Sequence, residues 1–209
     1  MIRLDELRTA LSAVTDQAWL ADAVASVAVD PAAVELRFAE AARRGGRAEL
    51  SVAPRWSADE AVRTLLLAAL PVAETSTWAQ NLYWHGDAGE KRAVLKALAL
   101  LPVGDECLVL LHDAIRSNDP RLLTAALGPF ARRLDQAMWR QAVLKCVFMA
   151  VPLNQVEDLA RRADSELGRM LSDVAEERAA ADRKMPDDAL ELLASIESSI
   201  NLEACDAHF

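Results

Sequence analysis

Residues 87–130 read DAGEKRAVLKALALLPVGDECLVLLHDAIRSNDPRLLTAALGPF, and this stretch decides the fold. Asp87 followed three places later by Glu90 is typical of a helix start. The turn at 102–104 and the helix start at 118–120 divide the stretch into three helices. The first helix carries an apolar stripe at helical spacing, formed by Val94, Leu95, Leu98 and Leu101. The pattern therefore predicts consecutive helices that pair antiparallel through their apolar faces.

The same helical pattern continues towards the amino terminus. Residues 3–44 predict two or three amphipathic helices, with breaks at Asp16 and at the Asp30-Pro31 pair. Residues 45–56 are the least regular part and predict a loop or a short extended piece. Residues 57–60, Ser-Ala-Asp-Glu, form a capping-box pattern that starts the next helix. No stretch alternates apolar and polar residues with a period of two, so strands are not a main element.

The carboxy-terminal third is also helical in pattern. Residues 155–184 predict one long charged helix, and a second begins at Pro186. Residues 119–128 resemble the first half of a HEAT-type repeat. A single unit does not establish a solenoid, because about three repeats are needed to form a continuous core. We therefore predict an all-α fold of about ten helices in one domain, residues 1–209, with HEAT-like character in its central part.

Composition limits the classes of function. Hydrophobic residues make up 53% of the chain, which indicates a globular protein. Acidic residues number 32 and basic residues 23, for a net charge of −9, so we expect no nucleic-acid partner. The longest nearly apolar run, 142–153, is interrupted by Lys145 and is too short to span a membrane. Three widely spaced cysteines and no secretory signal favour a cytoplasmic location.

The first candidate site is the helix junction at 83–87. Here Tyr83, Trp84, His85 and Asp87 bring aromatic surface, an imidazole and a carboxylate together. Histidine is the usual proton carrier at neutral pH, and an indole offers a face on which a ligand can rest. The alternative is structural. In that interpretation Gly86 ends one helix, Asp87 caps the next, and the indole of Trp84 wedges between them.

The second candidate site lies in the apolar stretch 135–149. Its sequence is hydrophobic on nearly all sides, which predicts a central helix. Arg140 and Lys145 are therefore unusual, because charges are rarely buried without partners. One interpretation places them in an internal pocket, as a clamp for a carboxylate or phosphate. In the other, Arg140 pairs with a nearby acid and Lys145 extends to solvent.

Signatures of metal binding and nucleophilic catalysis are poor. Cys107 and His112 are five residues apart and do not share a helical face. Cys205 and His208 have a spacing found in metal sites, but they fall in the predicted tail at 201–209. The sequence contains no HExxH, GxSxG, Walker A or GxGxxG motif. We therefore expect neither a metal site nor a bound cofactor, and metal dependence is kept only as a third and weaker hypothesis.

Three runs of the sequence resemble the signature of the EboA-domain family. They are 82–95, 118–129 and 134–152, and the resemblance extends over residues 57–184. Proteins of this family accompany prenyltransferase-like, cyclase-like and sugar-isomerase-like proteins in bacterial specialised-metabolite clusters. The resemblance therefore implies a role with a small polar or prenylated metabolite, and it brings no catalytic residues with it.

On this resemblance the chain divides into three parts. Residues 1–56 are amino-terminal helices without a family marker, 57–184 are the EboA-like region, and 185–209 are a carboxy-terminal helix and tail. Two hypotheses of function follow, and neither decides whether the protein is an enzyme. One is a small-molecule-binding protein or enzyme, and the other is a non-catalytic HEAT-like scaffold that docks other proteins of the pathway.

The first hypothesis places a pocket between the helices of 74–101 and the helix of 135–150. It assigns His85 as the acid/base and Asp87 as its orienting partner. Its predicted ligand-binding residues are the anion clamp, Arg140 and Lys145, and the aromatic side chains Tyr83, Trp84 and Trp139.

Overall fold

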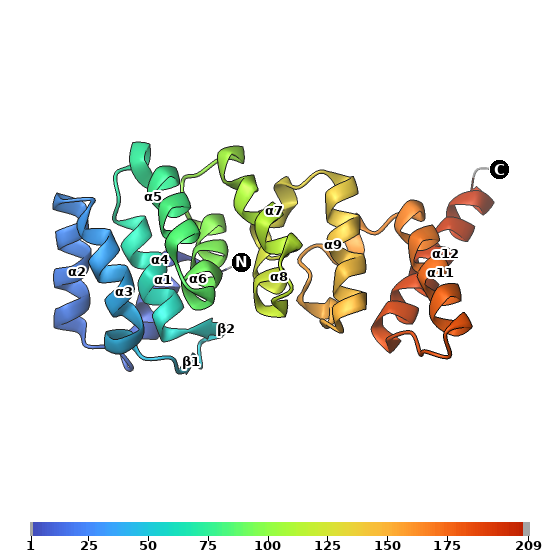
Figure 1. The fold of residues 1–209 in the computed structure, drawn as a ribbon, viewed down its shortest axis with the longest axis horizontal. Helices are drawn as coiled ribbons and strands as arrows, with labels where there is room; N and C mark the ends of the chain where they lie inside the picture. Colours follow the sequence, from blue (N-terminus) through green and yellow to red (C-terminus); the bar gives the residue numbers. More distant parts are fainter. Residues whose placement is uncertain (1, 207–209) are drawn as a thin grey trace. The chain divides into compact units, whose positions relative to one another are not determined.

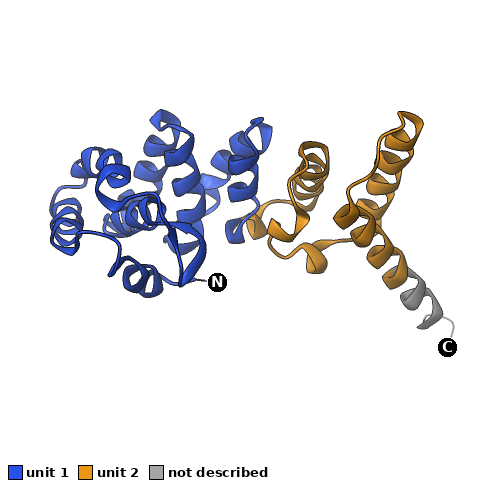
Figure 2. Ribbon diagram, turned by 90° about the horizontal axis from the view of Figure 1, so that it is seen from below, with its two compact units in different colours: residues 1–130 blue, residues 131–209 orange. Residues whose placement is uncertain are grey.

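The computed structural model describes residues 2–206, with side chains described through residue 199. It is α-helical apart from one two-stranded sheet, which confirms the all-α prediction (Figure 1). Within the described residues there are twelve α-helices, where the sequence predicts about ten. Contacts divide the chain into two compact units, residues 1–130 and residues 131–209 (Figure 2).

The first unit is built around one central helix, α4. It contacts five other helices of the unit, and every one of its residues from 58 to 67 is buried. The elements of this unit are α1 (Leu4–Leu11), α2 (Gln17–Val29), α3 (Ala33–Gly45), β1 (Glu49–Leu50), β2 (Ala53–Ser57), α4 (Ala58–Ala68), α5 (Val72–His85), α6 (Ala88–Ala97), α7 (Leu108–Arg116) and α8 (Pro120–Ala126). Short 3-10 turns at Leu98–Leu100 and Asp105–Cys107 connect α6 to α7.

Helix starts in the first unit follow the predicted caps. The Asp16 side chain accepts hydrogen bonds from the backbone N–H groups of the first turn of α2. Asp87 and Glu90 cap α6 reciprocally, with the Glu90 N–H donating to Asp87 Oδ1 at 2.8 Å and the Asp87 N–H donating to Glu90 Oε2 at 3.0 Å. Asp119 caps α8, and Pro120 occupies its first position. The sequence therefore locates these three starts correctly.

The irregular segment at 45–56 contains the sheet. Strands β1 and β2 pair antiparallel as a short hairpin, which confirms the predicted loop or extended piece. Gly46 has φ +77°, in the left-handed region that glycine adopts without steric cost. At the end of the hairpin the Glu60 side chain accepts a hydrogen bond from the Ser57 N–H at 2.9 Å, as the capping pattern predicts.

The second unit differs from its prediction at one point. Its helices are α9 (Gln136–Met149), α10 (Leu159–Arg162), α11 (Ser165–Ala180) and α12 (Asp187–Asp206), with 3-10 turns at Pro129–Arg133 and Leu153–Gln155. The prediction of one helix over 155–184 is wrong. Asp164 has an extended backbone and caps α11 by accepting a hydrogen bond from the Leu167 N–H at 3.0 Å, so the chain breaks between α10 and α11.

Helices α11 and α12 pack closely in the second unit. Leu167 and Leu171 of α11 are fully buried. A Cβ added at Gly168 would lie 2.9 Å from Cγ2 of Ile196, so the absence of a side chain permits this approach. The predicted tail begins inside α12, whose backbone is helical through Asp206, and residues 207–209 lie outside the described part. The HEAT-like character of the central helices stays a prediction.

Candidate functional site

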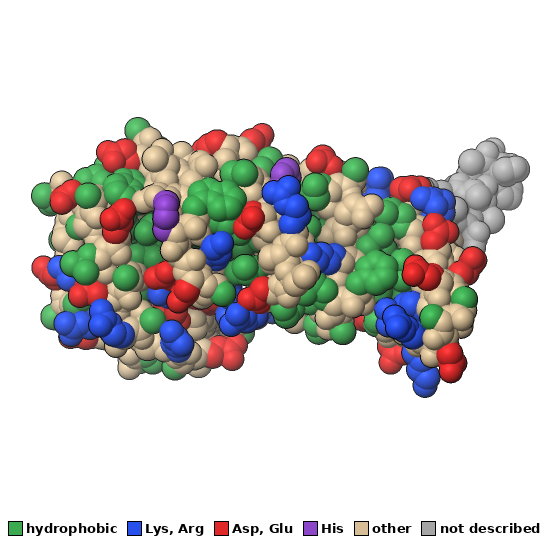
Figure 3. Space-filling view, viewed as in Figure 1, with side chains coloured by type: hydrophobic (Ala, Val, Ile, Leu, Met, Phe, Trp, Pro, Cys, Tyr) green, Lys and Arg blue, Asp and Glu red, His purple; other side chains and the backbone are tan. Residues whose placement is uncertain are grey.

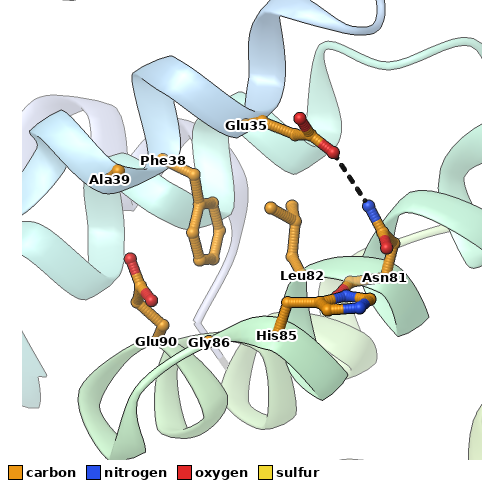
Figure 4. A pocket seen from close by; sticks show the side chains of 8 residues that line it. All are labelled: Glu35, Phe38, Ala39, Asn81, Leu82, His85, Gly86 and Glu90. Atoms are coloured by element: carbon orange, nitrogen blue, oxygen red, sulfur yellow. Dashed lines mark hydrogen bonds between the residues drawn. The ribbon is translucent and has the colours of Figure 1, made fainter.

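A pocket of about 400 Å³ lies between α3, α5 and α6 in the first unit (Figure 4). This volume is within the range of small-molecule sites. Eight residues line it: Glu35, Phe38 and Ala39 from α3, Asn81, Leu82 and His85 from α5, Gly86 from the following turn, and Glu90 from α6. Among the residues predicted to form a site, His85 is the one that reaches this pocket.

Local helix geometry places the polar side chains of the pocket. Asn81 and His85 are four residues apart on α5 and therefore share one face of that helix. Across the pocket on α3, the Glu35 carboxylate accepts a hydrogen bond from the Asn81 amide at 3.1 Å. Phe38 and Leu82 are buried and form the apolar floor between the two helices. The pocket thus combines an apolar floor with a polar rim.

The imidazole of His85 is oriented by the backbone of its own helix. Nδ1 lies 2.9 Å from the Asn81 carbonyl oxygen. Because a carbonyl oxygen only accepts hydrogen bonds, Nδ1 carries the proton in this arrangement, and a neutral ring keeps its lone pair on Nε2. The predicted orienting partner, Asp87, instead accepts a hydrogen bond from the Glu90 N–H as the cap of α6. This is the structural role that the sequence offers as the alternative.

Glu90 connects the pocket to a buried charge network. Its Oε2 accepts a hydrogen bond from the Asp87 N–H, and its Oε1 lies 3.5 Å from Nη2 of Arg63. Arg63 is only 3% exposed. Its guanidinium donates to Asp59 at 2.5 Å and to the Phe38 carbonyl oxygen at 3.1 Å, and its central carbon lies 5.2 Å from the centroid of the Phe38 ring. Arg63 therefore contacts both Phe38 and Glu90, two residues that line the pocket.

A second part of the network surrounds Glu60. This residue is 2% exposed, and its carboxylate pairs with Arg92 at 3.1 Å and with Lys96. The Lys96 ammonium also contacts the Arg55 carbonyl oxygen and lies 4.3 Å from the centroid of the Trp56 ring. Burial lowers the pKa of Lys96, and the neighbouring Glu60 partly offsets that shift. The capping pattern at 57–60 predicts Glu60 only as a helix cap, and no local motif predicts this network.

Tyr83 and Trp84 do not line the pocket. Tyr83 is fully buried, and its hydroxyl donates a hydrogen bond to Asp113 Oδ2 at 2.9 Å. Burial, together with the adjacent Asp113 carboxylate, raises the pKa of the Tyr83 hydroxyl. Trp84 is 43% exposed and contacts Tyr83 edge to face, with ring centroids 5.2 Å apart. The candidate segment therefore separates into a core tyrosine, an exposed indole, a histidine in the pocket and a helix cap.

The second group of predicted residues lies in the second unit. Trp139 is fully buried, and the guanidinium carbon of Arg162 lies 4.8 Å from its ring centroid. Arg140 forms an ion pair with Asp164, with Nη2 and Oδ2 2.6 Å apart, as the structural alternative predicts. Lys145 is half-buried on the same helix as Arg140. A pocket shared by these residues and His85 would join the two units, and it stays a prediction.

The Arg140–Asp164 pair gives a pH-dependent contribution to stability. Its hydrogen bonds hold the pKa of Asp164 at about 2, below the ordinary 3.8. Because the folded-state pKa is lowered, the stabilisation is present above about pH 4 and is lost as the pH falls towards about 2. Asp164→Asn removes the charge but keeps a capping side chain. In urea unfolding, we expect the difference in unfolding free energy between the wild type and this variant to disappear as the pH falls from about 4 to about 2. An unchanged difference would show that the Asp164 charge does not contribute to stability.

The remaining candidates for reactive groups are few. Burial raises the pKa of the Cys107 thiol to about 11 and that of the Cys146 thiol to about 12, so both stay protonated at neutral pH. Cys205 and His208 lie outside the described side chains. In the part of the chain that the structure describes, no group of three His, Cys, Asp or Glu side chains could hold a metal ion. No described helix is both long and apolar enough to cross a membrane.

Acidic and basic side chains are interspersed on the face of the molecule that Figure 3 shows. On the described part of that face, basic residues do not form the continuous surface that binds phosphate backbones.

Comparison with known proteins identifies a family. The sequence model of the family described as "Metabolite traffic protein EboA" matches residues 4–194. The chain belongs to the EboA family. The match includes the amino-terminal helices α1 to α3, which carry none of the three runs that resemble the family signature, and it contains all eight residues of the pocket. No curated protein and no solved structure matches this EboA-family chain.

Proposed function

We propose that this EboA-family protein binds a small polar metabolite in the pocket between α3, α5 and α6 and thereby takes part in metabolite traffic. The observation that carries the proposal is the hydrogen-bonded set of Glu35, Asn81 and His85 on the rim of a pocket with an apolar floor. The family description supports the metabolite, and the geometry supports the location.

The rim is preorganised for binding. The Asn81 carbonyl fixes the His85 ring, and the Asn81 amide is held by Glu35. Side chains that are already held in place lose little conformational freedom when a ligand arrives, so more of the interaction free energy appears as affinity. The floor of Phe38 and Leu82 would accept the apolar part of a polar or prenylated intermediate from a specialised-metabolite pathway.

In this proposal His85 is first a ligand-holding residue. Its Nε2 lone pair would accept a hydrogen bond from the metabolite. The same lone pair would act as a general base in an enzyme, with the Asn81 carbonyl in the orienting role that the sequence assigns to Asp87. Binding is the step that both roles require.

A scaffold that docks other pathway proteins is the second candidate. The observation behind it is a set of large apolar side chains that are more than half exposed, and these would support docking where they form one contiguous patch: Val29, Leu36, Val52, Val72 and Phe148. A scaffold needs no occupied pocket, so retention of a metabolite distinguishes the two candidates.

The proposal predicts that His85→Ala and Asn81→Ala each lose a retained metabolite. The purified protein is incubated with a metabolite extract of its source cells, washed by gel filtration and analysed by mass spectrometry. Loss of one or two hydrogen bonds predicts about a tenfold fall in the retained compound. Thermal stability should change little for His85→Ala, because His85 is exposed.

The matched control is His112→Ala, a histidine substitution in α7 of the same unit and outside the pocket. It should retain the same compound as the wild type. Equal retention by all variants, or no compound retained by the wild type above the level of an unrelated protein, would contradict the proposal.

A further inference from the structure

We infer, on the basis of the proposed function, that the ligand of this pocket is a small organic amine that carries a positive charge. The inference starts from the polar atoms that line the pocket. Two of the eight lining residues are glutamates and none is Lys or Arg. A ligand that matches this lining must supply hydrogen-bond donors and positive charge.

Each polar side chain of the rim offers an acceptor. Glu35 uses Oε1 for the Asn81 amide, and its Oε2 has no hydrogen-bond partner among the described residues. His85 donates through Nδ1, so the neutral ring presents the Nε2 lone pair. Asn81 donates its amide to Glu35 and keeps its Oδ1 as an acceptor. An anionic ligand would meet a carboxylate at this rim, whereas an ammonium group would meet three acceptors.

The buried guanidinium of Arg63 does not make the pocket positively charged. Arg63 lies over the ring of Phe38, with its guanidinium carbon 5.2 Å from the ring centroid. Its charge is matched by Asp59 at 2.5 Å, and it also approaches Glu90. Arg63 is 3% exposed, so a ligand in the pocket does not reach it directly. The accessible charge of the pocket is therefore that of Glu35 and Glu90.

An organic cation matches the arrangement better than a metal ion does. In Figure 4, Glu35 lies at one end of the pocket with Asn81, and Glu90 lies beyond Phe38 at the other end. Metal ligands must converge on one point within about 2.0 to 2.6 Å. Among the described residues no three such side chains do so. Donors spread over a small molecule, with an apolar body against Phe38 and Leu82, complement this arrangement.

Three probes of nearly the same size test the charge. Tyramine, tyrosol and 4-hydroxyphenylacetate share a phenol ring and end in an ammonium, a hydroxyl and a carboxylate, respectively. Each is titrated into isotope-labelled protein while the imidazole signals of His85 and His112 are followed by NMR. His85→Gln identifies the His85 signal, and His112 reports any effect outside the pocket.

We expect tyramine to move the His85 signal with a Kd at least about fivefold lower than that of tyrosol, and 4-hydroxyphenylacetate to bind most weakly. Glu35→Gln should remove most of the advantage of tyramine over tyrosol. Glu74→Gln, a carboxylate substitution on α5 outside the pocket, should preserve the advantage.

The results that overturn the inference are separate from those that overturn the proposed function. If tyrosol or 4-hydroxyphenylacetate binds at His85 as tightly as tyramine, the inference that the ligand is an amine is wrong. The proposed function, binding of a metabolite in this pocket, is not contradicted by that result. If none of the three probes moves the His85 signal, the inference that the ligand is an amine is also wrong. Whether the pocket binds a metabolite at all is then decided by the retention experiment with His85→Ala and Asn81→Ala.

Discussion

Replacing Glu60 by alanine is expected to lower the free energy of unfolding by about 3 to 5 kcal/mol. Glu60 is 2% exposed and pairs with both Lys96 and Arg92. Its removal leaves the buried Lys96 ammonium without its counter-charge. Lys96 cannot turn to solvent without breaking its contacts with the Arg55 carbonyl and the Trp56 ring. The expected cost combines the desolvation of a charge that has lost its main partner with the loss of the capping hydrogen bond from the Ser57 N–H.

Two variants separate this mechanism from a general effect of losing a carboxylate. Glu166→Ala breaks an ion pair with Arg169 in which both side chains are about half exposed, and it should cost much less stability than Glu60→Ala because solvent screens the pair. The double variant Glu60→Leu with Lys96→Met removes both charges and should be more stable than Glu60→Ala. Urea unfolding followed by circular dichroism measures all three. A cost for Glu60→Ala no larger than that for Glu166→Ala would show that the network is solvated.

The same network stiffens the pocket. Glu60 and Arg63 are on α4, while Glu90 and Lys96 are on α6. The ion pairs that join these helices therefore hold Glu90 at the pocket as well as stabilising the unit. A pocket wall supported by buried charges keeps its shape before a ligand arrives, which is the condition for preorganised binding.

Helix starts are the part of the fold that the sequence predicts best. A cap is a local contact, in which a side chain satisfies a backbone N–H two or three residues later. Asp16, Asp87 and Asp119 cap helices at the positions that the sequence predicts, and Asp135 caps α9 in the same way. Asp164 caps a helix in the same way, but it lies in a charged stretch where an acid is also typical of a solvated helix face. The sequence alone therefore does not predict that the helix is interrupted between α10 and α11 at Asp164.

The Glu35–Asn81 pair at the rim of the pocket is a contact that a single sequence does not predict. His85 is predicted as a site residue because it combines with aromatic neighbours over a few positions. Glu35 is 46 residues from Asn81, and only the packing of α3 against α5 brings them together. No local motif marks such a pair. A polar residue on an exposed helix face is common, so Glu35 and Asn81 carry no signal of their own.

Aromatic residues are ambiguous for a related reason. A large ring that lines a pocket and one that fills a core produce the same pattern of apolar neighbours in the sequence. Tyr83 and Trp139 are both predicted to face a ligand, and both are fully buried in the structure. Their partners, Asp113 and Arg162, are distant in sequence and were not predicted.

Replacing Trp139 by alanine is expected to destabilise the second unit by about 3 to 5 kcal/mol. Trp139 is fully buried in α9, so the truncation leaves a cavity that the surrounding helices fill only in part. Arg162 also loses the ring face over which its guanidinium lies. Unfolding by urea, followed by circular dichroism, measures the loss. Trp84→Ala is the control, because Trp84 is 43% exposed and its removal opens a smaller cavity.

The indole nitrogen makes this prediction more specific. Among the described residues, Nε1 of Trp139 is buried and has no hydrogen-bond partner. Trp139→Phe keeps most of the apolar volume and removes an unsatisfied donor, so it should cost far less than Trp139→Ala. A core role predicts this order of stabilities. If Trp139 instead lines a ligand site, the alanine variant should keep nearly wild-type stability without ligand and lose the increase in stability on adding the retained metabolite. That result would contradict the core assignment and restore Trp139 as a candidate binding residue.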